Sequence, residues 1–129
     1  MTVAEGRAAV RSYFEDFLNR GDMAAADAIF MPEVSFQYPL GGLNGVEAIK
    51  GYIAAFRTAF PDVQFTVEDV FGEDDRVAAR WRLAGSQTGA FRGKPPTGKH
   101  VTVSGNTIFR VRSGRIGEIW VAFDPAPLA

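Results

Sequence analysis

The sequence of 129 residues contains no cysteine and a single histidine. Without cysteine the chain has no disulfide, no thiolate nucleophile and no thiolate metal ligand. The one histidine, His100, follows Gly98 and Lys99 in an expected loop, where we expect it to face solvent. Transition-metal sites draw mainly on cysteine and histidine. We therefore expect neither a bound metal nor another cofactor.

Long apolar runs and a strong charge imbalance are also missing. No segment approaches the ~20 consecutive apolar residues of a membrane span. The first residues mix acidic side chains into the sequence, which is unlike a secretory signal peptide. The formal net charge of −1 provides no field that would gather nucleic acid or an anionic membrane. These features predict a cytoplasmic protein with no nucleic-acid or membrane partner.

Aromatic residues are plentiful by comparison. The chain has 11 phenylalanines, 3 tyrosines and 2 tryptophans, within a composition that is 47% hydrophobic and 22% charged. Those proportions are ordinary for a globular protein, and the length predicts one domain over residues 1–129. The aromatic side chains are consistent with either a filled core or an aromatic-lined pocket.

Apolar residues recur at helical spacing in three segments. The first helix precedes Gly21, which suits the left-handed position at a helix end. Asp22 is placed to cap a short second helix that ends before Pro32. A third helix is expected over residues 46–60, because Pro61 disfavours helical geometry in the residue before it.

The remaining segments show the period of two that is typical of half-buried strands. We expect a short strand over residues 34–38, a glycine-rich loop over 39–45, and a bulge near Asp69. The later strands are expected over residues 63–71, 76–88, 101–112 and 115–123. Helices that precede a run of antiparallel strands indicate an α+β fold.

The turn at Ser113 and Gly114 decides which residues of the last hairpin face inward. A two-residue turn would place Thr107 opposite Trp120, and a three-residue loop would place it opposite Ile119. Ser-Gly is not a favoured pair for a two-residue turn, so we predict the three-residue loop. The inward face is then expected to hold Gly105, Thr107, Phe109, Ile119, Val121 and Phe123.

A set of short motifs in the second half of the chain resembles the SnoaL-like polyketide cyclase family, a branch of the nuclear transport factor 2-like superfamily. The motifs are Ala59-Phe60-Pro61-Asp62, Arg80-Trp81, the run from Gly93 to Lys99, Ile108-Phe109-Arg110, Gly114-Arg115-Ile116, Trp120 and Asp124. The resemblance implies a cone-shaped, mostly antiparallel sheet curved around three helices, with one apolar pocket.

The resemblance also implies a ligand: a small apolar or aromatic metabolite, such as a polycyclic or aromatic ketone. Combined with the helix stripes and the chosen hairpin register, it predicts a set of ligand-contacting residues. They are Tyr13, Phe14, Phe17, Tyr38, Phe56, Phe60, Thr107, Phe109, Val121 and Phe123.

The positions that hold the acid–base residues of characterised cyclases are altered here. By resemblance, an aspartate on the last strand is replaced by Val121, and two histidines are replaced by Gln87 and Thr107. Gln87 can polarise a carbonyl but cannot act as a base. Asp124 is the remaining carboxylate near the last strand. It is our candidate proton carrier if a bend turns it toward the pocket, and otherwise it belongs to the outer face.

Three functions stay open at this point. The protein is a cofactor-independent cyclase or isomerase, a binding protein for an apolar metabolite, or a dimeric interaction domain. A carboxylate inside the pocket would favour the first. A lining of apolar residues and tyrosines would favour the second. Large apolar residues on the outer face, around Ile108 and Trp120, predict a homodimer in any of these cases.

Overall fold

The first helix begins as an α-helix and changes its winding halfway. In the computed structural model, which describes residues 3–128, α1 (Val3–Ser12) continues directly into a π-helical segment, η1 (Tyr13–Asn19). The spacing of apolar residues predicted an α-helix over this whole segment. The structure corrects that prediction, because η1 has the wider winding of a π-helix. The apolar side chains of η1 are all buried: Tyr13, Phe14, Phe17 and Leu18. Gly21 follows with a φ of 68°, as its predicted role at the helix end requires.

The second and third helices begin and end close to where the sequence predicts. The carboxylate of Asp22 accepts hydrogen bonds from two amides in the first turn of α2 (Met23–Ile29), which confirms the predicted cap. The third helix, α3 (Val46–Ala59), stops just before Pro61. None of the helices in residues 3–128 has the length and apolar character that crossing a membrane requires.

Six strands form one sheet in the order β2-β1-β6-β5-β4-β3. Their bounds are β1 (Phe30–Tyr38), β2 (Gly41–Asn44), β3 (Gln64–Glu73), β4 (Arg76–Ser86), β5 (His100–Arg112) and β6 (Arg115–Phe123). β1 and β6 are parallel and every other pair is antiparallel. The structure thus confirms the α+β prediction.

Two details of the early strands differ from the prediction. Residues 39–45, expected to be a loop, contain the edge strand β2. The first strand begins earlier than expected and includes Pro32. This proline lies where the pairing of β1 with β6 is irregular, between Phe30 and Ser35. A bulged stretch tolerates proline because no ladder hydrogen bond is required from its nitrogen.

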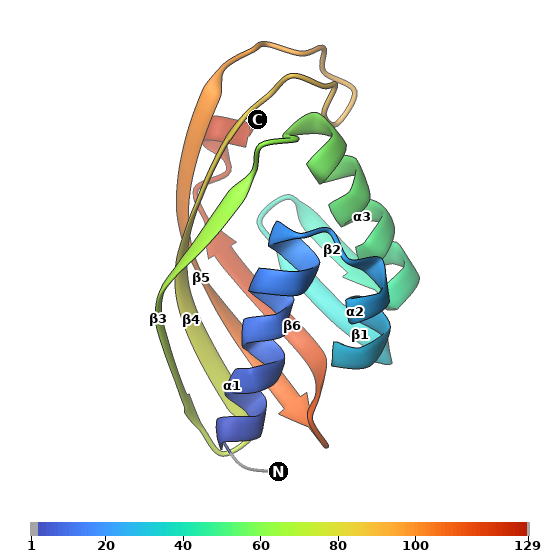
Figure 1. Cartoon of the computed structure of the whole chain (residues 1–129), viewed down its shortest axis with the longest axis vertical. Coiled ribbons are helices and arrows are strands. Elements are labelled where there is room, and N and C mark those ends of the chain that lie inside the picture. The colour runs from blue at the N-terminus through green and yellow to red at the C-terminus, as the bar shows by residue number, and fades with distance from the viewer. Residues whose placement is uncertain (1–2, 129) are drawn as a thin grey trace.

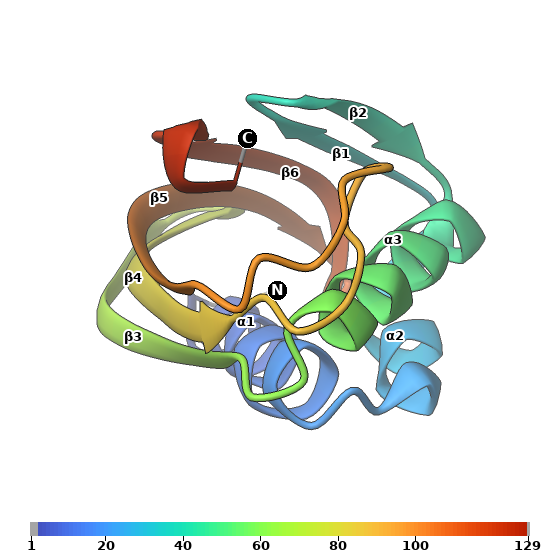
Figure 2. The same cartoon turned by 90° about the horizontal axis from the view of Figure 1, so that it is seen from above.

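The sheet curves around the first helix and does not close into a barrel. Figure 1 shows α1 along the concave side, and Figure 2 shows the strands curving around it from β3 to β2, with α2 and α3 on the remaining side. The loop between β4 and β5 lies at the same end of the molecule as the 3₁₀ turn η2 (Ala126–Leu128).

In the last hairpin the inward-facing residues are those predicted, but the turn that joins the two strands differs from the prediction. Ser113 and Gly114 form a two-residue turn with φ values of 52° and 76°, so the predicted three-residue loop is wrong. The register then shifts by one residue between β5 and β6, because Gly117 is bulged, and Thr107 pairs with Val121. The extra residue restores the side-chain alternation, so the predicted inward set is buried or half-buried. A second register shift, between Val67 and Asp69, confirms the bulge expected there.

Candidate functional site

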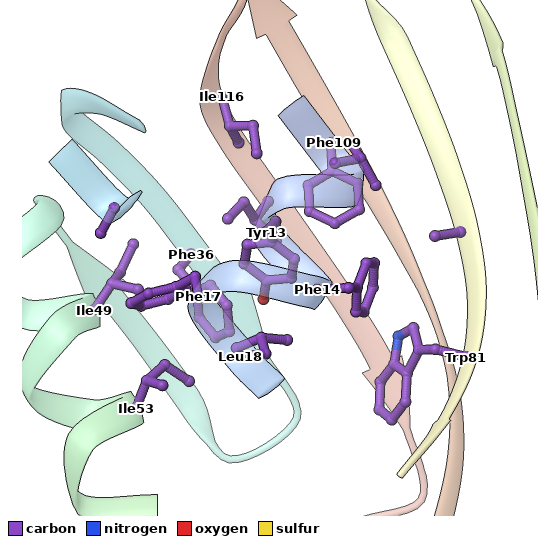
Figure 3. Close-up of a cluster of buried hydrophobic side chains, with 14 of the residues drawn as sticks. Tyr13, Phe14, Phe17, Leu18, Phe36, Ile49, Ile53, Trp81, Phe109 and Ile116 are labelled. Carbon is purple, nitrogen blue, oxygen red and sulfur yellow. The ribbon is translucent and has the colours of Figure 1, made fainter. Parts of the chain in front are cut away.

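A cavity of about 60 Å³ lies between the concave face of the sheet and the helices η1 and α3. Every strand except β2 contributes to its wall, as does the turn η2. The residues around it are Tyr13, Phe14, Leu18, Phe36, Tyr38, Tyr52, Ile53, Phe56, Phe65, Trp81, Leu83, Thr107, Val121, Phe123 and Leu128. Figure 3 shows several of them, with Tyr13 from η1 between the helices and the sheet.

The structure places most of the predicted ligand-contacting residues around this cavity. They are Tyr13, Phe14, Tyr38, Phe56, Thr107, Val121 and Phe123. Three other predicted residues are absent from the cavity wall and belong to the packed core. Phe17 packs edge-on against Phe30, with 5.5 Å between ring centroids. Phe60 and Phe109 are likewise fully buried. The spacing of apolar residues identifies a buried face but not the depth of each side chain within it.

The sequence analysis did not predict several residues of the cavity wall, although most of them occupy positions that the periodicity of apolar residues indicates. Tyr52 lies three residues after Ile49 and four before Phe56, so it belongs to the apolar stripe of α3. Phe36, Phe65 and Trp81 occupy inward positions of their strands and follow from the period of two. Leu128 follows the last strand and carried no periodic signal.

Apart from the indole N–H of Trp81, the polar side-chain groups of the cavity wall are hydroxyls. They belong to Tyr13, Tyr38, Tyr52 and Thr107. The rings of Tyr38 and Tyr52 lie 5.1 Å apart. Burial, together with the neighbouring Tyr52, raises the pKa of Tyr13 well above its ordinary value of 10. Burial, the proximity of Tyr38 and a hydrogen bond between these two side chains raise the pKa of Tyr52 in the same way. Both phenols therefore remain neutral hydrogen-bond donors at physiological pH.

The hydroxyl of Thr107 is held in place by an indole. The Nε1–H group of Trp81 donates a hydrogen bond of 2.8 Å to the Thr107 oxygen, and both residues are buried. Gly105 allows the indole to lie this close to β5. A β-carbon at Gly105 would approach the Trp81 ring and would lie 2.8 Å from the carbonyl oxygen of Ala122.

The described wall of the cavity contains no carboxylate, histidine, lysine or arginine. No cavity-lining residue in the range 3–128 therefore has an ordinary pKa near neutrality. Within the same range, no three histidine, aspartate or glutamate side chains come together as a metal site would require. What the wall offers a ligand is aromatic surface and hydrogen-bond donors.

Gln87, predicted to polarise a carbonyl, holds the loop between β4 and β5 together. Its amide nitrogen donates to the carbonyl oxygens of Gly89 and Pro95, each at 3.3 Å, and its amide oxygen accepts from Thr97 at 3.1 Å. The same loop is anchored by Phe91, whose ring packs edge-on against Phe56 and Phe60 at 5.5 and 5.6 Å. Gln87 therefore shapes a segment beside the cavity and is absent from its wall.

Asp124, predicted as a proton carrier, is exposed and lies outside the cavity wall. One of its carboxylate oxygens accepts a hydrogen bond of 3.0 Å from the amide of Ala126. This local bond shapes the turn that leads into η2. His100 is exposed, as expected, and its Nδ1 lies 3.2 Å from the hydroxyl of Ser86.

The chain matches one protein-family model over residues 8–129, that of the SnoaL-like polyketide cyclases. Among solved structures, a protein from Jannaschia sp. CCS1 assigned as a SnoaL-like polyketide cyclase superposes with a TM-score of 0.89 at 25% identity, covering 97% of this chain and 89% of the other. IdmH from Streptomyces antibioticus, assigned as a polyketide cyclase, superposes with a TM-score of 0.82 at 27% identity, covering 95% and 94%.

A third similar structure carries a different assignment. AclR from Streptomyces galilaeus, assigned as a hydroxylase, superposes with a TM-score of 0.83 at 25% identity, covering 98% of this chain and 94% of the other. No functionally curated protein matches the sequence. Because structures of one fold carry different assignments, the reaction has to be argued from the cavity itself.

Proposed function

Because the chain belongs to the SnoaL-like polyketide cyclase family, we propose that its cavity binds an aromatic or polycyclic metabolite bearing a carbonyl group. One observation carries this proposal: the described cavity wall combines aromatic side chains with hydroxyl groups and contains no charged side chain. Flat aromatic walls suit flat aromatic ligands. A ligand carrying a full charge would find no partner for it among these residues.

The hydroxyls determine which polar group the ligand carries. Tyr13 is a neutral donor, and Thr107 can donate its own proton while its oxygen accepts from Trp81. Tyr52 is also neutral, and its side chain is hydrogen-bonded to that of Tyr38. A ketone oxygen accepts two hydrogen bonds, so it can satisfy more than one of these donors. Each such bond contributes about 0.5–1.5 kcal/mol to binding.

The composition of the cavity wall also supports ligand binding without proton abstraction. Aldol closure and ketone isomerisation both require a base that removes a proton next to a carbonyl. By resemblance to characterised cyclases, the position of their aspartate is Val121, which cannot supply that base. We therefore propose that this protein binds and polarises its ligand. Gln87 and Asp124 then serve to shape segments beside the cavity.

A matched pair of ligands tests the carbonyl preference. 2-Acetylnaphthalene and 2-isopropenylnaphthalene have nearly the same shape, but only the first has a hydrogen-bond acceptor. We expect the ketone to bind about 2- to 10-fold more tightly by calorimetry, the equivalent of one hydrogen bond. Thr107→Val should reduce that ratio. Thr102→Val is the control, because Thr102 lies on the same strand but is exposed. Equal affinities in the wild-type protein would contradict the proposal.

Proton exchange distinguishes a binding protein from an enzyme. In heavy water, an active-site base would accelerate deuterium exchange at the acetyl methyl group of 2-acetylnaphthalene. We expect no acceleration above buffer. Clear acceleration would favour a cyclase or isomerase, and its loss in Asp124→Asn would identify Asp124 as the proton carrier.

We further propose that the outer face of the sheet mediates homodimer formation. Phe71, Ala78, Ile108 and Trp120 are successive partners across β3, β4, β5 and β6, and we name them the outer apolar row. Phe71, Ile108 and Trp120 are 58%, 46% and 37% exposed.

Ion pairs lie beside the outer apolar row, including Arg110 with Glu118 at 3.5 Å and Arg80 with Glu68 at 3.3 Å. An apolar centre with a charged rim is the usual composition of a subunit interface.

A further inference from the structure

The turn after β6 inserts a leucine side chain into the wall of the cavity. Leu128 is only 7% exposed and lies at the end of η2, which contacts β5. The turn is shaped by two local hydrogen bonds. The amide of Ala126 donates to Asp124 at 3.0 Å, and the amide of Leu128 donates to the carbonyl of Pro125 at 2.9 Å. An apolar side chain of the protein itself thus reaches the place proposed for the ligand.

The free volume beside Leu128 is too small for the proposed ligand. The cavity measures about 60 Å³. An apolar cavity that accommodates benzene has roughly 150 Å³, and pockets for small molecules have roughly 300–1,000 Å³. A naphthalene-sized ligand can therefore enter only if part of the wall moves outward.

The turn η2 is the part of the wall that can move at least cost. The other wall elements are strands within the sheet ladder or helices of the core, and moving them would break many backbone hydrogen bonds. The two hydrogen bonds described for the turn join residues 124–128 only to one another. The segment can swing away as a unit, and the sheet stays intact.

We propose that Leu128 acts as an internal plug, filling the ligand site when no ligand is bound and leaving it when the ligand enters. This inference rests on the proposed function, because it assigns a closed and an open state to the same cavity. Binding then requires the open state. The apparent affinity is lower than the intrinsic affinity by the fraction of molecules that are open.

Shortening the plug tests the idea with N-phenyl-1-naphthylamine, an uncharged aromatic probe that fluoresces when it is removed from water. A minor open state populated at roughly 0.1–10% predicts at least about tenfold tighter binding in Leu128→Ala, together with faster association. Leu40→Ala is the matched control, because Leu40 lies between β1 and β2 and is absent from the cavity wall. Val121→Trp, which fills the cavity, should abolish binding and so locate the probe.

The wild-type protein provides a second test that does not depend on a variant. The methyl resonances of Leu128 should lie away from random-coil positions in the free protein, because aromatic rings share the cavity wall. Saturating probe should move them to random-coil positions. Equal affinities of wild type and Leu128→Ala, or methyl resonances that do not move on binding, would overturn the plug and leave the pocket proposal standing. Failure of every protein to bind either this probe or 2-acetylnaphthalene would overturn both proposals.

Discussion

Trp81 and Thr107 connect strands β4 and β5 through a side-chain hydrogen bond of 2.8 Å inside the core. Thr107 is 2% exposed and is the buried polar residue of the described core. The indole N–H would otherwise have no partner in this apolar setting. The bond therefore permits a tryptophan to line the cavity, and it fixes the oxygen that faces the proposed ligand.

Removing the hydroxyl of Thr107 should destabilise the protein more than shortening the side chain. Thr107→Val leaves the Trp81 N–H buried without an acceptor, which costs about 1–3 kcal/mol in the free energy of unfolding. Thr107→Ser keeps the acceptor and should lose less. Urea denaturation of both variants measures the difference. Equal losses would mean that the hydrogen bond contributes little to stability. Thr102→Val should behave like the wild type, because Thr102 is exposed.

The buried tyrosines predict a loss of stability at alkaline pH. The pKa values of Tyr13 and Tyr52 are raised in the folded protein, whereas tyrosines of the unfolded chain ionise near pH 10. Below about pH 10 both states hold these protons, and the free energy of unfolding does not depend on them. Above about pH 10 the unfolded chain binds fewer protons than the folded one, so stability falls as the pH rises.

Urea denaturation at several alkaline pH values, repeated for Tyr13→Phe and Tyr52→Phe, measures this effect. Each replacement should reduce the decline, which is at most about 1.4 kcal/mol per pH unit for one group. Phenolate absorbance provides an independent check. Ionisation of Tyr13 or Tyr52 near pH 10 in the folded protein would contradict the prediction.

A carboxylate introduced at Val121 should confer base chemistry on the cavity. Val121 lines the cavity, so burial should raise the pKa of an aspartate there toward neutrality. We expect Val121→Asp to accelerate deuterium exchange of 2-acetylnaphthalene by up to about 10²–10⁴-fold. The variant should also be less stable, because it buries a polar group.

Ala122→Asp is the control for this gain of activity. Ala122 neighbours Val121 in sequence but is exposed on the opposite face of β6. It should show no gain in exchange. Acceleration in both variants, or in neither, would show that the cavity wall does not position the acetyl group near Val121.

A charge in the outer apolar row should prevent dimer formation. Ile108→Glu places a carboxylate at the centre of the row, between Ala78 and Trp120. Burying that charge in an interface would cost several kcal/mol, so the variant should sediment as a monomer. Thr102→Glu, on the same strand but outside the row, should leave the wild-type mass unchanged. A monomeric wild-type protein at moderate concentration would contradict the proposal.

The periodicity of apolar residues predicted most of the fold, because it indicates which face of each helix or strand is buried. The stripe of α3 and the alternation along β4 and β5 follow from which face of each element meets the core. The edge strand β2 was missed because its glycines indicate a loop, and only pairing with β1 makes it a strand. The π-helical winding of η1 has no sequence signature of this kind.

The last hairpin shows how a correct face can follow from an incorrect turn. Ser113 takes a left-handed conformation that the sequence disfavours, so the turn has two residues and not the predicted three. The bulge at Gly117 then shifts the pairing of β5 with β6 by one residue. Whether Thr107 and Val121 face inward depends only on the alternation of side chains along each strand, so the prediction of their inward positions is still correct. Which residues pair across the strands depends on the full register.

The sequence by itself determined the α+β class, the inward faces of the strands and the absence of cysteine chemistry. Each of these depends on residue type or on local periodicity. The tertiary structure alone decided that Gln87 and Asp124 stay outside the cavity and that Leu128 enters it. These positions depend on how loops and turns pack against distant elements. That packing balances many long-range contacts, which leave no periodic pattern in the chain.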